Sequence, residues 1–313
     1  MRTLLEEGGL DLAPIGSGRT AERWRALHDL ARDDVSVARL AEAHVDAVQI
    51  LAEAGRAPDP GCLLGVWASE GRAPVVAEGP ADGKWSLRGS KGFCGGAGLV
   101  DQALVTVRRG GGHHLALVAT ADLGPRIDSS GWVADALADT STAVVDLSGL
   151  TVAGDDLVGG DRWYLERRGF WHGAIGPAAC WAGAAAGLVA HARSHLPDDA
   201  HARAHLGAMD AAGWACVAAL DRAGREIDAG DDGGEEPRRR ALMVRHIVDR
   251  ASEEIQERFA RALGPRPLVA DADVIRRDGA LRIYRRQCHA ERDLEDLGAI
   301  VAATGGDRRQ GGP

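Results

Sequence analysis

The chain has 313 residues, 45% of them apolar, which is enough for two or three packed units around a large core. A net charge of -9 and a pI near 5.7 leave no basic stripe to neutralise phosphates, so nucleic acid is not expected as a partner. The acidic N-terminus and the lack of about 18 consecutive uncharged apolar residues predict a soluble, cytoplasmic protein without a membrane segment.

The cysteine pattern argues against a disulfide or a metal site. The chain has five cysteines, an odd number, and they are scattered without CxxC or Cys/His ligand spacing. This pattern is typical of reduced thiols. Neighbouring His113 and His114 fall in a predicted strand, where adjacent side chains point to opposite faces. We therefore predict no metal.

Residues 1–55 form a predicted N-terminal helical region. Thr20 is a plausible N-cap residue, and Asp34 or Ser36 can open a second helix whose apolar residues recur at helical spacing. Gly55 then ends that helix.

Residues 56–160 form a predicted β-domain. Short runs of β-branched and aliphatic residues alternate there with glycine, proline and aspartate, as in an antiparallel sheet or small barrel. The ADGK sequence at 81–84 predicts a tight turn.

Residues 161–313 form a predicted C-terminal four-helix bundle. Helical segments at about 163–195, 199–229, 236–263 and 272–303 are separated by stop signals. An apolar stripe on the third segment is expected to pack against a second copy, with the chain's own core as the alternative: Ala241, Val244, Ile247, Val248, Ala251 and Ile255. The acidic segment 228–236 is interpreted as a solvated loop. The predicted fold class is thus α+β multidomain.

Local sequence in this order resembles the acyl-CoA dehydrogenase family. The segment WSLRGSKGFCGGA at 85–97 is similar to the family's strand pair beside the flavin, and VWASEG at 66–71 is similar to a second flavin-side segment. The resemblance implies FAD, a small-molecule substrate such as an acyl thioester, and a homo-oligomer, either dimer or tetramer, with flavin between β-domain and bundle. It assigns the following cofactor-binding residues: Ala68, Ser69, Phe93, Cys94, Gly95, Leu263 and Gly264.

The family's catalytic glutamate is missing. The stretch 276–298 resembles the last helix of the family, and the glutamate falls on Arg285 or Arg286, depending on the alignment. Some members place the base on the first bundle helix, where this chain has Pro177. An arginine cannot accept a proton near neutral pH. Arg285 and Arg286 are therefore expected to hold an anionic group of the substrate or of reduced flavin.

Three other residues are candidates for acid–base chemistry. His289 is preferred because it follows the vacant position by one predicted helical turn, and histidine is the side chain type suited to proton exchange near neutral pH. Glu291 lies on the same predicted helix, with an ion-pair face as the alternative. His172 follows Phe170 and Trp171, so a packed aromatic wall is its alternative.

Three functional classes are implied by this resemblance and by the departures from it. The first is an FAD-dependent oxidoreductase acting on CH–CH groups of an acyl thioester or related substrate. The second is a flavin-dependent monooxygenase of the same fold, in which a histidine on the last helix supports the oxygen chemistry. The third is a non-catalytic relative that serves as a scaffold.

Overall fold

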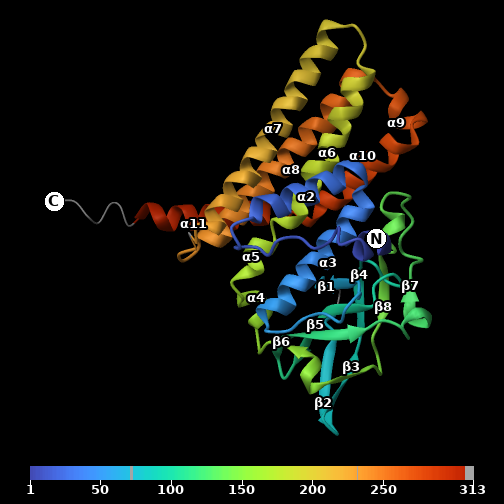
Figure 1. The fold of residues 1–313 in the computed structure, drawn as a ribbon, viewed down its shortest axis with the longest axis vertical. Helices are drawn as coiled ribbons and strands as arrows, with labels where there is room; N and C mark the ends of the chain where they lie inside the picture. The colour runs from blue at the N-terminus through green and yellow to red at the C-terminus, as the bar shows by residue number, and fades with distance from the viewer. Residues whose placement is uncertain (71–72, 231, 307–313) are drawn as a thin grey trace, which may run out of the picture. The chain divides into compact units, whose positions relative to one another are not determined.

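The structure is a computed structural model that describes residues 1–70, 73–230 and 232–306 (Figure 1). Its contacts divide the chain into two compact units. Unit 1 comprises Met1–Leu12 and Arg39–Phe170, and unit 2 comprises Ala13–Ala38 and Trp171–Pro313. Each unit is described by itself below. The three domain boundaries expected from the sequence stay a prediction.

Unit 2 is helical, and α6 lies at its centre (Figure 1). Helix α6 is apolar on all sides because it packs against α2, α7, α8 and α10. The helices are α2 (Thr20–Asp33), α6 (Gly176–His195), α7 (Ala200–Asp228), α8 (Glu236–Leu263), α9 (Arg266–Ala270), α10 (Ala272–Tyr284) and α11 (Glu291–Gly306). The expected helices at 199–229 and 236–263 are confirmed.

The expected continuous helix at 272–303 is wrong. Helix α10 ends at Tyr284 and is followed by a 3-10 turn, η4 (Arg285–Gln287), and by left-handed Ala290 with φ 49°. The backbone N–H of His289 donates to the Asp293 carboxylate at 3.1 Å, so a new helix, α11, starts here. His289 and Glu291 therefore do not continue the helix that carries Arg285. The first expected segment is likewise broken, into α4 (Trp163–Glu166), α5 (Gly169–Gly173) and α6.

Helix α2 reaches the bundle through close backbone approaches. A Cβ atom on Gly183 of α6 would lie 2.0 Å from the carbonyl oxygen of His28. The Asp228 carboxylate, at the end of α7, accepts hydrogen bonds from the backbone N–H groups of Gly18 and Thr20 and from the Thr20 hydroxyl. Asp228 thus caps the start of α2. The interpretation of 228–236 as a solvated loop is wrong for this residue.

The apolar stripe on α8 is mostly the chain's own core. Its buried members are Ala241, Val244, Val248, Ala251 and Ile255. Only Ile247 stays exposed, at 40%. The alternative interpretation of this stripe is therefore the correct one, and the stripe gives little support to packing against a second copy.

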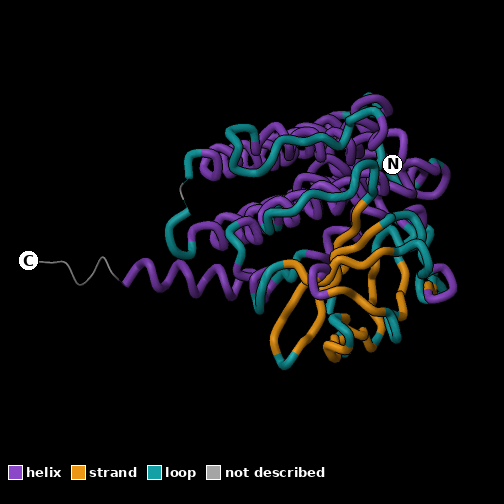
Figure 2. The backbone as a smooth tube through the Cα atoms, turned by 60° about the horizontal axis from the view of Figure 1, so that its bottom comes forward, coloured by secondary structure: helices purple, strands orange, loops and turns teal. Residues whose placement is uncertain are grey.

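Unit 1 contains α1 (Arg2–Glu6), most of α3 (Val35–Glu53) and the strands, which Figure 2 shows in orange. The strands are β1 (Leu64–Trp67), β2 (Val76–Ala81), β3 (Lys84–Arg88), β4 (Ser90–Cys94), β5 (Gln102–Arg109), β6 (Gly112–Ala119), β7 (Ile127–Asp128), β8 (Ala143–Asp146), β9 (Thr151–Ala153) and β10 (Leu157–Val158). One sheet has the order β10-β6-β5-β2-β3-β9, with β1 also on β5, and the other has the order β4-β8-β7.

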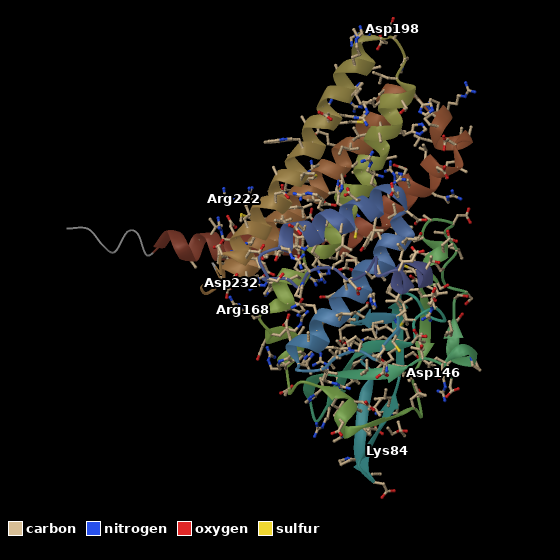
Figure 3. The ribbon with its side chains drawn as sticks, viewed as in Figure 1. Lys84, Asp146, Arg168, Asp198, Arg222 and Asp232 are labelled. Carbon is tan, nitrogen blue, oxygen red and sulfur yellow. The ribbon has the colours of Figure 1, made fainter. Side chains whose placement is uncertain are left out.

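The strand pairing is mainly antiparallel, as expected, but not wholly. Strands β1 and β2 both pair parallel to β5, at its two ends. The turn at 81–84 is confirmed: Asp82 and Gly83 are both left-handed, as a two-residue hairpin of this type requires, and Lys84 begins the return strand (Figure 3).

The core of unit 1 joins α3 to the larger sheet. Ala47, Ile50 and Leu51 of α3 are fully buried against Leu64 and Leu104 of the sheet. Buried His44 accepts a hydrogen bond at Nδ1 from the Leu64 N–H, at 3.1 Å. This bond fixes where β1 meets the helix.

Within the described part of the chain, one segment, Gly169–His195, has the length and apolar composition of a membrane span. However, 67% of its most apolar window is buried inside the protein, as in the core helix of a soluble protein.

Two glycine-to-alanine changes test the close approach of α2 and α6. G183A should lower the free energy of unfolding by about 1–3 kcal/mol, because the new methyl group overpacks against the His28 backbone. The control is G207A in α7, where an added Cβ has open space. It should raise stability by up to about 1 kcal/mol. Urea denaturation measures both, and equal effects would contradict the packing.

Candidate functional site

An exposed, strained aromatic residue marks one end of β4. Phe93 has φ 55° and is 69% exposed. A non-glycine residue in this left-handed region costs about 1–2 kcal/mol, and such strain concentrates at functional sites. Beside it, Cys94 is fully buried, and burial raises the pKa of its thiol to about 12. Cys94 is therefore a packing group rather than a nucleophile.

The backbone after Phe93 is held on both sides. The Trp67 indole N–H donates to the carbonyl of Gly95 at 3.0 Å, and the N–H of Gly96 donates to the carbonyl of Thr140 at 2.8 Å. The bond from Trp67 joins the two segments that the sequence assigned to flavin, because Ala68 and Ser69 follow Trp67 directly. Ala68 is partly buried and Ser69 is exposed.

Arg39 completes this part of unit 1, and sequence reasoning missed it. Its guanidinium donates to the hydroxyls of Thr140 and Thr142 at 3.1 and 2.8 Å. A Cβ on Gly95 would lie 3.1 Å from Arg39 Nη1, so glycine permits the approach. The loop that contains Thr140 and Thr142 has further left-handed residues, Leu137 (φ 58°) and Ser141 (φ 45°).

Leu263 and Gly264, also assigned to flavin, lie in unit 2. Helix α8 ends at Leu263, and Gly264 follows with φ 70°, donating its N–H to the carbonyl of Ala260. Glycine is suited to this left-handed position after a helix. Their contact with a flavin stays a prediction.

Arg285 and Arg286, which the sequence resemblance assigned to the place of the family's glutamate, differ in their surroundings. Arg285 is buried, and its Nη1 lies 2.8 Å from Asp249 Oδ1 while its Nη2 lies 3.5 Å from Glu253 Oε1. Arg286 is exposed and lies 3.4 Å from the same Asp249 oxygen. Carboxylates therefore already balance the charge of Arg285. Of the pair, Arg286 has more capacity for a further anion.

His289 lies in the break before α11 and forms a pair with a buried carboxylate. Its side chain is 63% exposed, and its Nδ1 lies 3.4 Å from Asp293 Oδ1. Turning Nδ1 toward the carboxylate leaves Nε2 open for proton exchange. Glu291 is exposed in the first turn of α11 and makes no ion pair within the described part of the chain.

His172 is part of a buried ionic network. Its Nε2 lies 3.1 Å from Asp232 Oδ1, and Arg240 Nη1 lies 3.1 Å from the same oxygen. Arg240 Nε also lies 3.0 Å from Glu226. Figure 3 labels Asp232, which the sequence placed in a solvated loop; its side chain is in fact buried. The network gives His172 a structural role in joining α5, α7 and α8.

Arg245 holds the break in the last helix. Its Nη1 donates to the carbonyl of Ala174 at 2.8 Å, and its Nη2 donates to the carbonyl of Gln287. Its guanidinium also lies 5.0 Å above the ring of Trp181, and its Nε lies 4.0 Å from Asp293. A single buried cation thus ties the start of α6 to both sides of the break.

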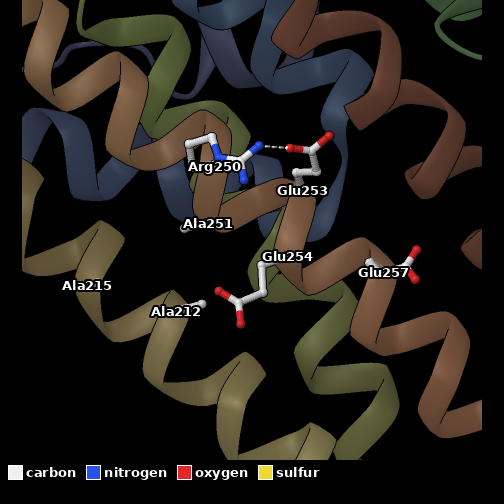
Figure 4. Close-up of a pocket in the computed structure, with 7 residues that line it drawn as sticks. All are labelled: Ala212, Ala215, Arg250, Ala251, Glu253, Glu254 and Glu257. Atoms are coloured by element: carbon white, nitrogen blue, oxygen red, sulfur yellow. Dashed lines mark hydrogen bonds and ion pairs between the residues drawn. The ribbon is translucent and has the colours of Figure 1, made fainter.

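An open groove of about 670 Å³ lies between α7 and α8, where the Glu254 side chain of α8 points toward Ala212 of α7 (Figure 4). Each of its carboxylates has a neighbouring arginine: Glu253 pairs with Arg250, Glu254 with Arg258 and Glu257 with Arg261. The groove has neither an aromatic residue nor an unbalanced charge in its lining. It is therefore a weaker candidate than the Phe93 region.

Comparison with known proteins supports a fold assignment. No protein-family model matches the chain, and no curated protein matches its sequence. Solved structures do match. TdsC, the dibenzothiophene monooxygenase of Paenibacillus sp. A11-2, solved with FMN and indole, has a TM-score of 0.76 at 18% identity, covering 89% of this chain and 82% of TdsC.

Two further structures cover nearly the whole chain. The methanesulfinate monooxygenase MsuC of Pseudomonas fluorescens has a TM-score of 0.82 at 18% identity, covering 96% of this chain and 89% of MsuC. KijD3, solved with FMN and a dTDP-linked amino-keto sugar, has a TM-score of 0.81 at 18% identity, covering 97% and 86%. The chain therefore has the acyl-CoA dehydrogenase-like fold of flavin-dependent enzymes.

Replacing Arg245 tests its role at the break. R245M should lower the free energy of unfolding by about 3 kcal/mol, because it removes the charged donors of two partly buried hydrogen bonds and the cation that lies 4.0 Å from Asp293. R245K should recover only part of the lost free energy of unfolding, since lysine keeps the charge but lacks the planar two-donor fork of arginine. R250M, on the exposed side of α8, should change stability by no more than about 0.5 kcal/mol. Urea denaturation compares the three, and a loss in R245M no larger than in R250M would contradict this role.

Proposed function

We propose that the protein is a flavin-dependent monooxygenase acting on a small molecule. The observation that carries the oxygenase class is the His289–Asp293 pair, an oriented histidine with an open Nε2. When bound, the flavin supplies the redox chemistry with dioxygen. His289 serves as the acid–base group of the reaction, and Asp293 fixes its tautomer and orientation.

We propose that the Phe93–Gly96 segment and Ala68–Ser69 contact the flavin ring. The exposed aromatic face of Phe93 suits stacking, and the Gly95 backbone, held by Trp67 and backed by Arg39, offers a rigid edge. FAD is the expectation of the sequence, whereas TdsC and KijD3 are solved with FMN. Chromatography of the flavin released on denaturation distinguishes the two.

Dehydrogenation of an acyl thioester is the less favoured function. It needs a base for the α-proton, and the position of the family's glutamate holds buried Arg285, which is paired with Asp249. The scaffold interpretation makes a different prediction, since a scaffold need not bind flavin. Absorbance between 350 and 500 nm in the purified protein separates it from both enzyme classes.

We also propose a cytoplasmic homo-oligomer. Cytoplasmic location follows from the sequence composition, and oligomerisation follows from the family resemblance. Exposed apolar residues on α7 and α8 support a contact with a second copy: Trp214, Val217 and Ile247.

Relieving the strain at Phe93 should separate stability from function. F93G should stabilise the flavin-free protein by about 1 kcal/mol, because glycine adopts φ 55° without cost, yet weaken flavin binding by removing the aromatic face. The matched control is D82G, at φ 50° in the β2–β3 turn, which should leave flavin affinity unchanged. Thermal unfolding and flavin titration measure both effects. Unchanged flavin affinity in F93G would remove Phe93 from the site.

Replacing His289 tests the acid–base assignment. With flavin reduced chemically and then mixed with O2 and indole as probe substrate, H289A should form oxygenated product about 10²- to 10⁴-fold more slowly. H201A, which changes an exposed histidine of α7, should keep the full rate. In the wild-type protein, butyryl-, octanoyl- and isovaleryl-CoA should not bleach the bound flavin under anaerobic conditions. Rapid bleaching by any of them would instead establish the dehydrogenase class.

A further inference from the structure

Two cations lie near one another in unit 1 without a carboxylate partner. Lys91 of β4 is only 1% exposed, and its ammonium group donates to the carbonyl and hydroxyl oxygens of Thr106, at 3.2 and 2.6 Å. On strand β5, Arg108 lies two residues after Thr106, so the two side chains leave the strand on the same face. Burial lowers the pKa of the Lys91 ammonium, and the Arg108 charge lowers it further.

Only some of the guanidinium nitrogens of Arg108 have a hydrogen-bond partner. Its Nη1 contacts Nε2 of His113, which lies directly across the β5–β6 pair. Its Nε is buried and has no hydrogen-bond partner in the described chain. Because Nη1 is engaged by His113, the Nε–Nη2 edge of the fork is the part without an acceptor.

The surrounding charges do not balance these cations. Among the described residues, neither Lys91 nor Arg108 forms an ion pair with a carboxylate. The acidic group that acts on Lys91 is exposed Glu70, at longer range, and Glu78 is engaged by Arg88. By contrast, the buried guanidiniums of Arg167, Arg240 and Arg285 all pair with carboxylates.

Burying a cation without a counter-charge costs several kcal/mol, and chains keep such groups mainly where a ligand compensates them. The Nε–Nη2 edge of a guanidinium matches two oxygens of a tetrahedral oxyanion. We propose that Arg108, held by His113 and reinforced by the charge of Lys91, is an anion subsite for a phosphate- or sulfate-like group.

The oxyanion has two possible sources, the phosphate of the flavin or an anionic group on the substrate. Only the first rests on the proposed flavin function. The segment Ala68–Glu70 lies beside this face, since the Thr106 hydroxyl that binds Lys91 also lies 3.4 Å from the carbonyl of Ala68. The anion subsite thus adjoins a segment that the sequence assigned to the cofactor.

Sulfate titration of the flavin-free protein tests the subsite independently of flavin. Calorimetry at constant ionic strength should show sulfate binding in the wild type, and R108Q should weaken it at least about tenfold. The matched control is R109Q: Arg109 is the next residue, leaves the strand on the other face and lies 4.0 Å above the Trp85 ring. It should bind sulfate like the wild type. No sulfate binding in the wild type, or equal affinity in R108Q, would overturn the proposal.

Comparing FMN with riboflavin identifies the source. If the oxyanion is the flavin phosphate, R108Q should weaken FMN binding and leave riboflavin binding unchanged. If the loss of sulfate affinity comes without any loss for FMN, the oxyanion belongs to the substrate. A wild type that binds sulfate but no flavin would defeat the proposed function and leave the anion subsite standing.

A second variant covers the case in which R108Q does not fold. R108K keeps the charge but loses the two-donor edge, so sulfate affinity should fall several-fold while the circular dichroism spectrum stays that of the wild type. Full affinity in folded R108K would exclude the guanidinium edge as the binding element.

Discussion

The helical unit depends on how Arg245 satisfies backbone carbonyls at two interruptions. Chain breaks leave carbonyls without helical partners, and burial makes an unpaired carbonyl costly. Arg245 donates to the carbonyl of Ala174 just before α6 and to the carbonyl of Gln287 before α11. Its guanidinium can serve both because it carries five N–H donors in a planar fork. The break that it stabilises places His289 against Asp293. The acid–base candidate therefore exists because the last helix is interrupted.

Charge balance differs between the buried arginines of the helical unit and Arg108 of unit 1. Arg240 and Arg285 have buried or partly buried carboxylates at hydrogen-bond distance, and these pairs hold helices together. Arg108 instead contacts a histidine nitrogen and, among the described residues, has no carboxylate in an ion pair. The sequence predicted an anion site at Arg285 and Arg286, whereas the anion subsite proposed here is at Arg108 on strand β5 of unit 1.

Backbone strain gives a second, independent indication of function. Phe93 sits in a left-handed conformation with its ring exposed, so burial of the ring does not repay the strain. The neighbouring backbone is fixed by Trp67 and Thr140, and Arg39 closes behind Gly95. A rigid, exposed aromatic edge is suited to a planar ring system, and the solved structures with this fold include ones that contain FMN.

Local chemistry sets the features that could be predicted from the sequence: the helices at 200–228 and 236–263 and the Asp82–Gly83 turn. The arginines at 285 and 286, where the resemblance expects a carboxylate, are read from the sequence directly. Helical periodicity and turn preferences act over a few residues, so a short stretch of sequence is enough to predict them. The folded chain was needed to find the break at His289, the parallel pairing of β1 with β5 and the capping of α2 by Asp228, 208 residues from Thr20. These depend on partners distant in sequence, whose hydrogen bonds override local propensity, and the contacts of Arg39 and Arg108 arise in the same way.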